Sequence, residues 1–428
     1  MTRMVASLSA LILSILLLVS GNAFLTTLLG IRLSIEEVEP SVIGWVLVCY
    51  SIGFVLGTLY VNRIISRVGH IRAFAAFAAL AAVTALIYPL SVTMVLWAVL
   101  RGLSGFSIAG VLVVIESWFS SRATNANRGA LFAVYQIVFY IAAAGGQLVV
   151  NLGDPANFMP FTLAAILLTL ALIPLALTRM EAPIIESTER LSFFTLARDS
   201  FSGAAGAVVS GVLIGSFYAL GPVYATMAGL DVSRTSIFMA VAIVAAMALA
   251  WPLGLICDRF DRRRLMFLVS LIAATTAVVV AMTGSTNTLL LMALVGIFTG
   301  FAATLYPIAV AITNDRLASH QIVAASATLL LSYGIGSVIG PIVMAELMSL
   351  LGPAGLFWGN AGFLILLASV TSYRINHTPD VPVAEQEHFV AAMPEASPVL
   401  AEIDPRNDDF HPESAEASGD GEALRKVG

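Results

Sequence analysis

Long apolar runs recur along the whole chain, and they restrict its fold more than any other feature of the sequence. A helix needs about 20 apolar residues to cross a bilayer. Only 11% of the 428 residues are charged, against about 25% in soluble domains. The sequence therefore predicts an all-α membrane protein with twelve transmembrane helices. The predicted spans are approximately 7–31, 41–62, 73–91, 94–119, 128–151, 158–178, 201–224, 235–257, 265–283, 289–312, 322–348 and 353–374.

The placement of arginine predicts the orientation of these helices. If the N-terminus lies inside, fifteen arginines fall in cytoplasmic connections, and only Arg32 and Arg234 fall in outer ones. Cytoplasmic connections of membrane proteins carry an excess of Lys and Arg. We therefore expect both termini in the cytoplasm. The first apolar run is too long for a cleaved signal peptide, so we expect it to remain as a helix.

Polar segments divide the chain into four parts. Residues 1–178 and 201–374 each hold six predicted spans, and a polar cytoplasmic linker, 179–200, lies between them. Residues 375–428 carry twelve acidic and three basic residues, several prolines and no hydrophobic periodicity. Such a composition cannot bury enough apolar area to offset the entropy of ordering, so we expect a disordered cytoplasmic tail. The tail is either a solvated segment or a binding site for an unknown partner.

The two halves resemble each other in sequence. The segment SRVGHIR (66–72) between spans two and three matches DRFDRRR (258–264) between spans eight and nine, at an offset of 192 residues. The segment GLSGF (102–106) in span four matches GIFTGF (296–301) in span ten, at an offset of 195. Two matches at nearly one offset indicate two pseudo-symmetric six-helix halves.

The connection GLICDRFDRR (254–263) is similar to the signature of the major facilitator superfamily, G-x-x-x-D-R-x-G/D-R/K-R/K. The first-half copy departs from it, because Ser66 stands for the aspartate and Asn62 for the glycine. Within the superfamily, ALGPVYAT (219–226) and IESWFSSRATNANRGA (115–130) are most similar to YcaD-type bacterial members. The resemblance covers residues 1–374. The signature positions are Gly254, Asp258, Arg259, Asp261, Arg262 and Arg263, with Arg67, Gly69 and Arg72 in the first half.

This resemblance implies that the signature gates the transport cycle. Gly254 is small enough for close helix approach, and Asp258 can meet a helix N-terminus or an arginine across the bundle. Arg262 and its neighbours are equally well explained as charges that set topology. Ser66 cannot hold an ion pair, so we expect the first-half side of the gate to be looser.

Ionisable residues inside a membrane are costly, about 2.5–3.5 kcal/mol each on insertion scales, and they usually mark function. Arg101 and Glu116 lie in span four, and Glu346 lies near the outer end of span eleven. The first two are 15 residues apart, which separates them by roughly 22 Å along one helix face. They therefore cannot pair with each other.

Each of the two charges in span four has two interpretations. Arg101 either faces a cavity or extends to the outer headgroups, and the family resemblance implies a role in proton coupling. Glu116 either controls access or proton release, or pairs with Arg122 or Arg128. We expect small residues on the shared face, such as Gly105, to border a water-filled cavity.

Span five carries hydrogen-bonding side chains along one face, spaced 4, 7 and 4 residues apart. Such a stripe predicts either a polar cavity or tightly paired neighbouring helices. These residues are Gln136, Tyr140, Gln147 and Asn151. Further candidates, which serve equally well as contacts between helices, are Asn22, Tyr218 and Tyr306.

The sequence argues against several other functions. All five histidines fall in polar connections or the tail, and Cys49 and Cys257 have no metal-ligand spacing. We therefore expect no metal, no cofactor and no enzyme activity. No phosphate-binding loop of the ATPase type occurs, which argues against an ATP-driven pump.

We therefore expect a secondary active transporter of the bacterial inner membrane. It would move a small polar or anionic organic solute by alternating access, coupled to protons. The alternatives are a hydrophobic drug or multidrug efflux antiporter and a non-transporting scaffold or sensor. The expected partners are the small-molecule substrate, protons and the lipid bilayer, with no nucleic acid, and the expected state is a monomer.

Overall fold

The computed structural model describes residues 2–124, 127–178, 196, 198, 200–284, 287–317, 321–379, 381–386, 388–394 and 400. Its first half contains α1 (Thr2–Ile35), α2 (Pro40–Val68), α3 (His70–Ile87), α4 (Met94–Ser120), α5 (Arg128–Val149), α6 (Met159–Leu170) and α7 (Leu172–Ala176). Its second half contains α9 (Phe201–Met227), α10 (Val232–Cys257), α11 (Arg262–Thr283), α12 (Thr288–Asn314), α13 (Ile322–Leu351) and α14 (Gly355–His377).

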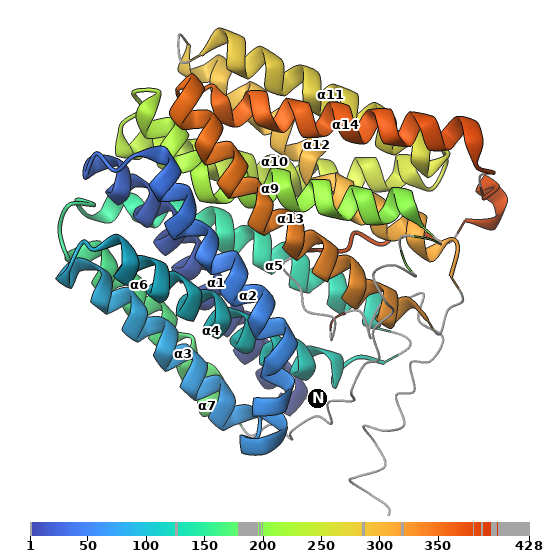
Figure 1. Ribbon diagram of the computed structural model, residues 1–428. Helices are drawn as coiled ribbons and strands as arrows, with labels where there is room; N and C mark the ends of the chain where they lie inside the picture. The colour runs from blue at the N-terminus through green and yellow to red at the C-terminus, as the bar shows by residue number, and fades with distance from the viewer. Residues whose placement is uncertain are drawn as a thin grey trace, which may run out of the picture.

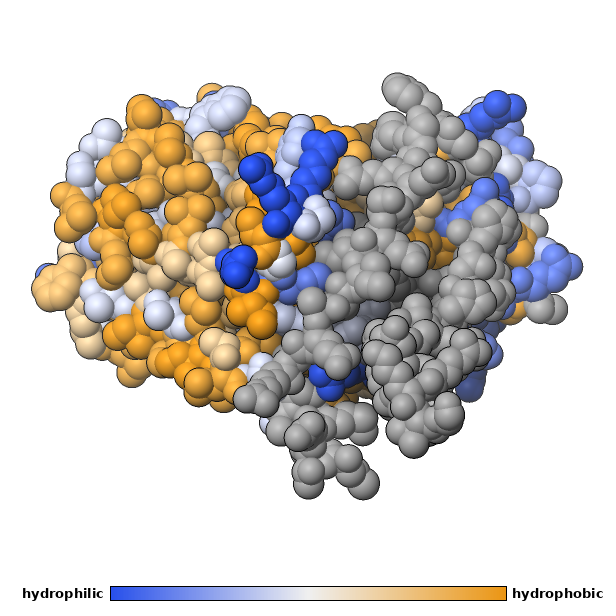
Figure 2. All heavy atoms as spheres, turned by 90° about the horizontal axis from the view of Figure 1, so that it is seen from below, coloured by the Kyte–Doolittle hydropathy of each residue, from blue (hydrophilic) through white to orange (hydrophobic). Residues whose placement is uncertain are grey.

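The predicted all-α membrane fold is confirmed. Twelve helical segments of the described chain are long and apolar enough to span a membrane. The first half occupies the lower part of Figure 1 and the second half the upper part. Apolar residues cover much of the face shown in Figure 2 outside the grey atoms. Large apolar side chains are exposed on the bundle, among them Trp251.

The sixth predicted span is one run in the sequence but two helices in the structure. α6 ends at Leu170 and α7 begins at Leu172. Pro174 lies just after this break and has no backbone N–H to donate to the preceding turn. A missing hydrogen bond of this kind explains why the helix is interrupted there.

The two halves repeat the same helix pairs. α5 packs on α1, and α13 packs on α9; likewise α4 packs on α2, and α12 packs on α10. Small residues allow the close approach. A Cβ placed on Gly146 would lie 2.4 Å from the carbonyl oxygen of Ser20, and one on Gly336 would lie 1.9 Å from that of Val208. These distances leave no room for a side chain at either position, in either half.

The small residues of α4 serve this packing as well, which corrects one expectation. A Cβ on Gly105 would lie 2.1 Å from the carbonyl oxygen of Tyr50, and one on Gly57 would lie 2.6 Å from the Cβ of Ala109. Gly105 and Ala109 therefore face α2 closely and do not border a water-filled space. The physical reason is that two helices with small residues approach until their backbones touch.

The two halves meet at one end of the bundle, which we call the closed end. Ser41 of α2 donates its backbone N–H to Ser349 Oγ of α13 at 3.0 Å. Asn151 Nδ2, after α5, donates to Ser236 Oγ at the start of α10, at 2.8 Å. The opposite end of the bundle carries the connection 258–261 between α10 and α11. We call this end of the bundle the arginine-rich end, because Arg259 and Arg262–Arg264 lie there.

The described part of the C-terminal tail packs against the bundle, whereas the sequence predicts that the whole tail is disordered. Residues 375–377 continue α14, and Phe389 and Val390 are half-buried against the core of the bundle. The run Phe389–Met393 is apolar although the tail as a whole is acidic, and its burial favours an ordered position. Residues 401–428, and all of the predicted linker except 196, 198 and 200, lie outside the described residues.

Candidate functional site

A cavity of about 180 Å³ lies between the two halves. Its walls come from α1, α2, α4 and α5 of the first half and from α9, α10 and α13 of the second. Most of the wall is apolar, including Leu112, Phe139 and Ile243. The polar residues in the wall are Asn22, Thr26, Thr27, Tyr50, Ser51, Arg101, Tyr140, Gln147, Tyr218, Tyr333 and Ser337.

Arg101 is the one charged residue among the described residues that line this cavity. Its side chain is 2% exposed, so it does not extend to the surface of the bundle as the headgroup interpretation requires. The guanidinium carbon lies 4.3 Å from the centre of the Tyr50 ring. Nε and Nη1 are buried and make no hydrogen bond of ordinary geometry to a described residue, although the hydroxyl of the buried Tyr88 lies near the guanidinium. Arg101 has no ion pair among the described residues, and a buried cation without a counter-charge favours an anion in this cavity.

Tyr50 is held in place by a second residue of the cavity wall. Asn22 Nδ2 of α1 donates to the Tyr50 hydroxyl at 3.0 Å. The ring of Tyr50 in turn faces Arg101 of α4, so three helices converge on one polar cluster. Asn22 and Arg101 stand out in the sequence as polar residues within apolar spans, whereas nothing in span two distinguishes Tyr50 from an ordinary buried aromatic residue.

The four hydrogen-bonding residues of α5 make contacts at three different levels along the helix. Gln147 accepts a hydrogen bond from Thr27 Oγ1 at 2.5 Å, and both line the cavity, as does Tyr140. Asn151 bonds to Ser236 at the closed end. Gln136 lies at the opposite level, where its Nε2 donates to the backbone oxygen of Ala391.

Two further candidates lie at different distances from the cavity. Tyr218 of α9 lines it. Tyr306 of α12 is buried and packs edge to face against Tyr333, with the ring centres 5.5 Å apart. Tyr333 lines the cavity, so Tyr306 supports the wall from behind.

Glu116 lies outside the cavity wall. It is fully buried and accepts a hydrogen bond from the Tyr135 hydroxyl of α5 at 2.5 Å. The structure thus does not bring it together with Arg101. Tyr135, which no feature of the sequence singles out, packs edge to face on Phe119 with the ring centres 5.6 Å apart, and this aromatic surrounding keeps the carboxylate away from water.

The second-half signature forms a contact network at the arginine-rich end. Arg262 of α11 makes a buried ion pair with Asp315 after α12, and their side chains are 2% and 4% exposed. Asp258 Oδ1 lies 3.7 Å from Arg262 and accepts the backbone N–H of Phe389 at 2.6 Å. Asp258 therefore meets the C-terminal tail and an arginine one turn away. The sequence suggested a partner across the bundle, but among the described residues Asp258 makes no ion pair with another helix of the bundle except α11.

The remaining signature residues have mainly structural contacts. Asp261 caps α11 by accepting the backbone N–H of Arg264 at 2.8 Å. Arg263 donates to the backbone oxygens of Thr378 and Pro379 at 3.2 and 2.8 Å, which fixes the start of the tail. Arg259 is exposed. Gly254 faces the ring of Phe389, since a Cβ there would lie 2.9 Å from it.

The first-half copy has fewer contacts. Ser66 Oγ donates to the backbone oxygen of Arg63 in its own helix at 3.0 Å. Gly69 has a φ of +84°, a conformation that favours glycine. Arg67 and Arg72 are exposed and have no ion pair among the described residues. The first-half connection therefore has fewer contacts than the second-half one, and a looser gate on that side stays a prediction.

Among the described residues, no group of three His, Cys, Asp or Glu side chains is placed to hold a metal ion.

Known proteins share both the sequence and the fold. The family model of the Major Facilitator Superfamily matches residues 4–289 and 204–406. The MFS-type transporter YcaD of Escherichia fergusonii is 31% identical over 375 residues, which cover 85% of this chain and 95% of YcaD. An MFS-type transporter of Enterobacter sp. (strain 638) is 32% identical over 338 residues, covering 78% of this chain and 87% of the relative.

Two solved structures are similar in fold. The nucleoside transporter NupG superposes with a TM-score of 0.72 at 17% identity and covers 87% of this chain and 100% of its own. A bacterial homologue of the human lysosomal transporter Spinster superposes with a TM-score of 0.70 at 14% identity, covering 88% and 97%.

Proposed function

Because the chain belongs to the major facilitator superfamily, we propose that it carries a small organic anion across the bacterial inner membrane by alternating access. The observation that carries this proposal is Arg101. Its guanidinium is buried in the wall of a cavity between the halves, and among the described residues it has no counter-charge. A buried charge without a counter-charge is costly, and an anionic group of a substrate would offset that cost.

The substrate should combine one anionic group with an apolar body. Arg101 supplies a single positive charge, whereas Phe139, Leu112 and Ile243 supply an apolar wall. Hydroxyl and amide groups such as those of Tyr50 and Gln147 can orient a polar substituent. The cavity is about 180 Å³, below the ~300–1,000 Å³ of pockets for drug-sized ligands. This size favours a small solute.

Proton coupling is the second part of the proposal. Glu116 is a fully buried carboxylate that bonds to Tyr135, and buried carboxylates in membrane helices are common elements of proton pathways. Arg101 lies on the same helix and in the cavity. In this scheme the arginine binds the anion, and the carboxylate takes up and releases the proton separately.

Labelled solutes tested in proteoliposomes, with and without an imposed pH gradient, would test this proposal. We expect a monocarboxylate with an apolar body to be transported, and a pH gradient to drive its accumulation. Arg101→Ala should abolish this transport at normal membrane abundance. Arg234→Ala is the matched control, because Arg234 is exposed, lies outside the signature and does not line the cavity. Normal transport by Arg101→Ala would refute the assignment of the anion site.

Export of a hydrophobic drug is the second candidate, and the largely apolar wall of the cavity favours it. The same panel separates the two. A hydrophobic cation or neutral drug that is transported equally well by the parent and by Arg101→Ala would support drug export, because such a solute gains nothing from the guanidinium.

A further inference from the structure

The C-terminal segment 389–394, which we call the strap, bridges the two halves at the arginine-rich end. On the second half, the backbone N–H of Phe389 donates to Asp258 Oδ1 at 2.6 Å, and its ring covers Gly254. On the first half, Gln136 Nε2 of α5 donates to the backbone oxygen of Ala391. One short segment is therefore bound by residues of both halves.

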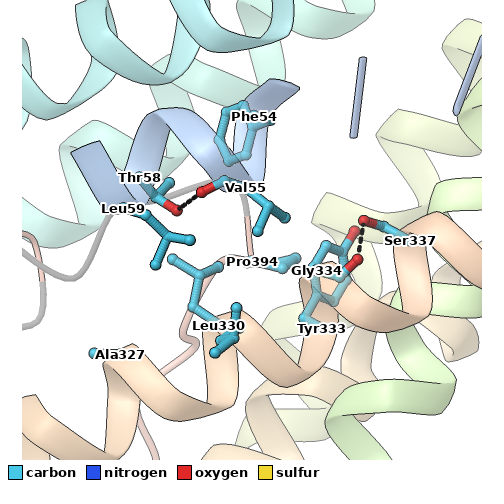
Figure 3. Close-up of a pocket in the computed structure, with 11 residues that line it drawn as sticks. Phe54, Val55, Thr58, Leu59, Ala327, Leu330, Tyr333, Gly334, Ser337 and Pro394 are labelled. Atoms are coloured by element: carbon cyan, nitrogen blue, oxygen red, sulfur yellow. Dashed lines mark hydrogen bonds between the residues drawn. The ribbon is translucent and has the colours of Figure 1, made fainter. Parts of the chain in front are cut away.

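The end of the strap reaches the space between the halves. Pro394 is buried and lines the central cavity as well as a smaller adjoining cavity of about 40 Å³. Figure 3 shows Pro394 between Leu59 of α2 and Leu330 of α13. Met393 is 5% exposed and belongs to the hydrophobic core. The strap thus inserts apolar side chains where the two halves face each other.

The strap is more deeply buried than the tail residues that precede it. Val383 lies between α14 and the strap and is 43% exposed, whereas Met393 is almost completely buried. The tether is short, because α14 ends at His377 and only eleven residues lie between His377 and Phe389. A short tether gives the strap a high effective concentration at its docking site, so modest contacts suffice to hold it.

Docking of the strap is incompatible with two steps of an alternating-access cycle. A solute that leaves the central cavity between α2 and α13 meets Pro394, which lines both the central cavity and the smaller cavity between these helices. Closure of the same end requires α2 and α13 to approach each other, and Pro394 lies between them (Figure 3). A docked strap therefore obstructs both solute exit and closure.

We propose that the strap is an autoinhibitory element, and that the site formed by Asp258, Gly254, Gln136 and the facing surfaces of α2 and α13 is its docking site. Docking holds the halves in the arrangement that is closed at the opposite end. Release of the strap permits exchange of solute and alternation. The inhibitory role rests on the proposed transport function, whereas docking and its effect on alternation do not require a known substrate.

Thiol labelling tests docking and alternation directly. In a full-length Cys49→Ser/Cys257→Ser background, Ala327→Cys reports on the smaller cavity beside Pro394. Ser236→Cys reports on the closed end, where Ser236 is fully buried. Each reporter is treated with a membrane-impermeant maleimide from its own side of the membrane. The strap is weakened by Phe389→Ser/Met393→Ser, and Val383→Ser is the matched control in the same tail.

Loss of the strap's apolar contacts should raise the labelling rate of both reporters about tenfold or more, and Val383→Ser should leave both rates unchanged. A rise at Ala327→Cys alone would show that the strap covers the mouth without restraining alternation, which would overturn the autoinhibitory role. Unchanged rates at both positions would overturn docking itself.

A reversible cross-link supplies the second test and does not depend on the folding of the weakened variant. Gln136→Cys and Ala391→Cys, in the same background, are joined in native membranes by a short bifunctional methanethiosulfonate, which forms a disulfide with each cysteine and releases methanesulfinate. We expect this cross-link to slow the later maleimide labelling of a third cysteine, Ser236→Cys, whose position is fully buried at the closed end, and to stop transport of any solute found in the panel. Cleavage of the reagent should restore both. Failure to cross-link, or undiminished labelling after cross-linking, would refute the proposal.

Discussion

The buried ion pair between Arg262 and Asp315 provides a quantitative test of how the arginine-rich end is held together. The two side chains are 2% and 4% exposed, so neither charge is solvated well when the other is removed. Asp315→Asn keeps the size of the side chain and removes its charge. The substitution leaves the guanidinium of Arg262 buried without its main counter-charge.

The structure sets the size of the expected effect. Breaking a buried ion pair by removing one partner costs about 3–5 kcal/mol. Arg262 keeps partial compensation, because it lies 3.7 Å from Asp258 and donates to the backbone oxygen of Ala311 at 3.3 Å. We therefore expect Asp315→Asn to lower the free energy of unfolding by about 3 kcal/mol, the lower limit of that range.

The double variant Arg262→Met/Asp315→Leu tests the physical reason. Replacing both charges by apolar residues removes the desolvation penalty together with the attraction, so stability should return to near the parent value. Unfolding in detergent is followed by the reactivity of Cys257, which is fully buried in the folded protein. If Asp315→Asn unfolds like the parent, or if the double variant loses as much stability as Arg262→Met and Asp315→Leu combined, the loss does not come from an unpaired buried charge.

Three further predictions concern topology, coupling and the gate. Reporter labelling should place residues 32–40 outside and the tail in the cytoplasm; a periplasmic tail would contradict both the orientation and the helix count. Glu116→Gln should flatten the pH dependence of transport while the protein remains folded, because the amide keeps the hydrogen bond to Tyr135 but cannot exchange a proton; an unchanged pH profile measured in proteoliposomes would make the carboxylate structural. Asp258→Ala should accelerate labelling at the arginine-rich end more than Asp258→Asn, because asparagine retains an acceptor oxygen for the Phe389 N–H; equal rates for both variants and the parent would remove Asp258 from the gate.

The sequence was sufficient to predict the fold because membrane insertion depends on local composition. A run of about 20 apolar residues forms a helix in lipid whatever its neighbours are, since every backbone group must be hydrogen-bonded within the segment. The twelve spans, the duplicated halves and the family therefore followed from the printed residues. The sequence also made Arg101 a candidate for the site, because a charge inside an apolar run usually marks function, and the structure places this residue in the wall of the central cavity.

The partners of these residues were decided by the tertiary structure. Tyr50 joins Asn22 and Arg101 only because α1, α2 and α4 cross at that level. Asp315 follows the tenth span, and nothing in the sequence indicates its partner. It pairs with Arg262 because α11 lies beside the end of α12. Hydrophobicity indicates where a helix begins and ends. It does not give the rotation of that helix about its axis to the accuracy that a hydrogen bond requires.

The position of the tail was likewise beyond the sequence. The composition of residues 375–428 predicts disorder because, averaged over its length, the segment is acidic and poor in apolar residues. Its one apolar run, Phe389–Met393, becomes ordered only where a complementary surface exists. That surface is formed by helices of both halves that are far apart in the sequence. The sequence by itself therefore determined which segments enter the membrane, and the packing of the two halves determined which side chains meet and where the tail is bound.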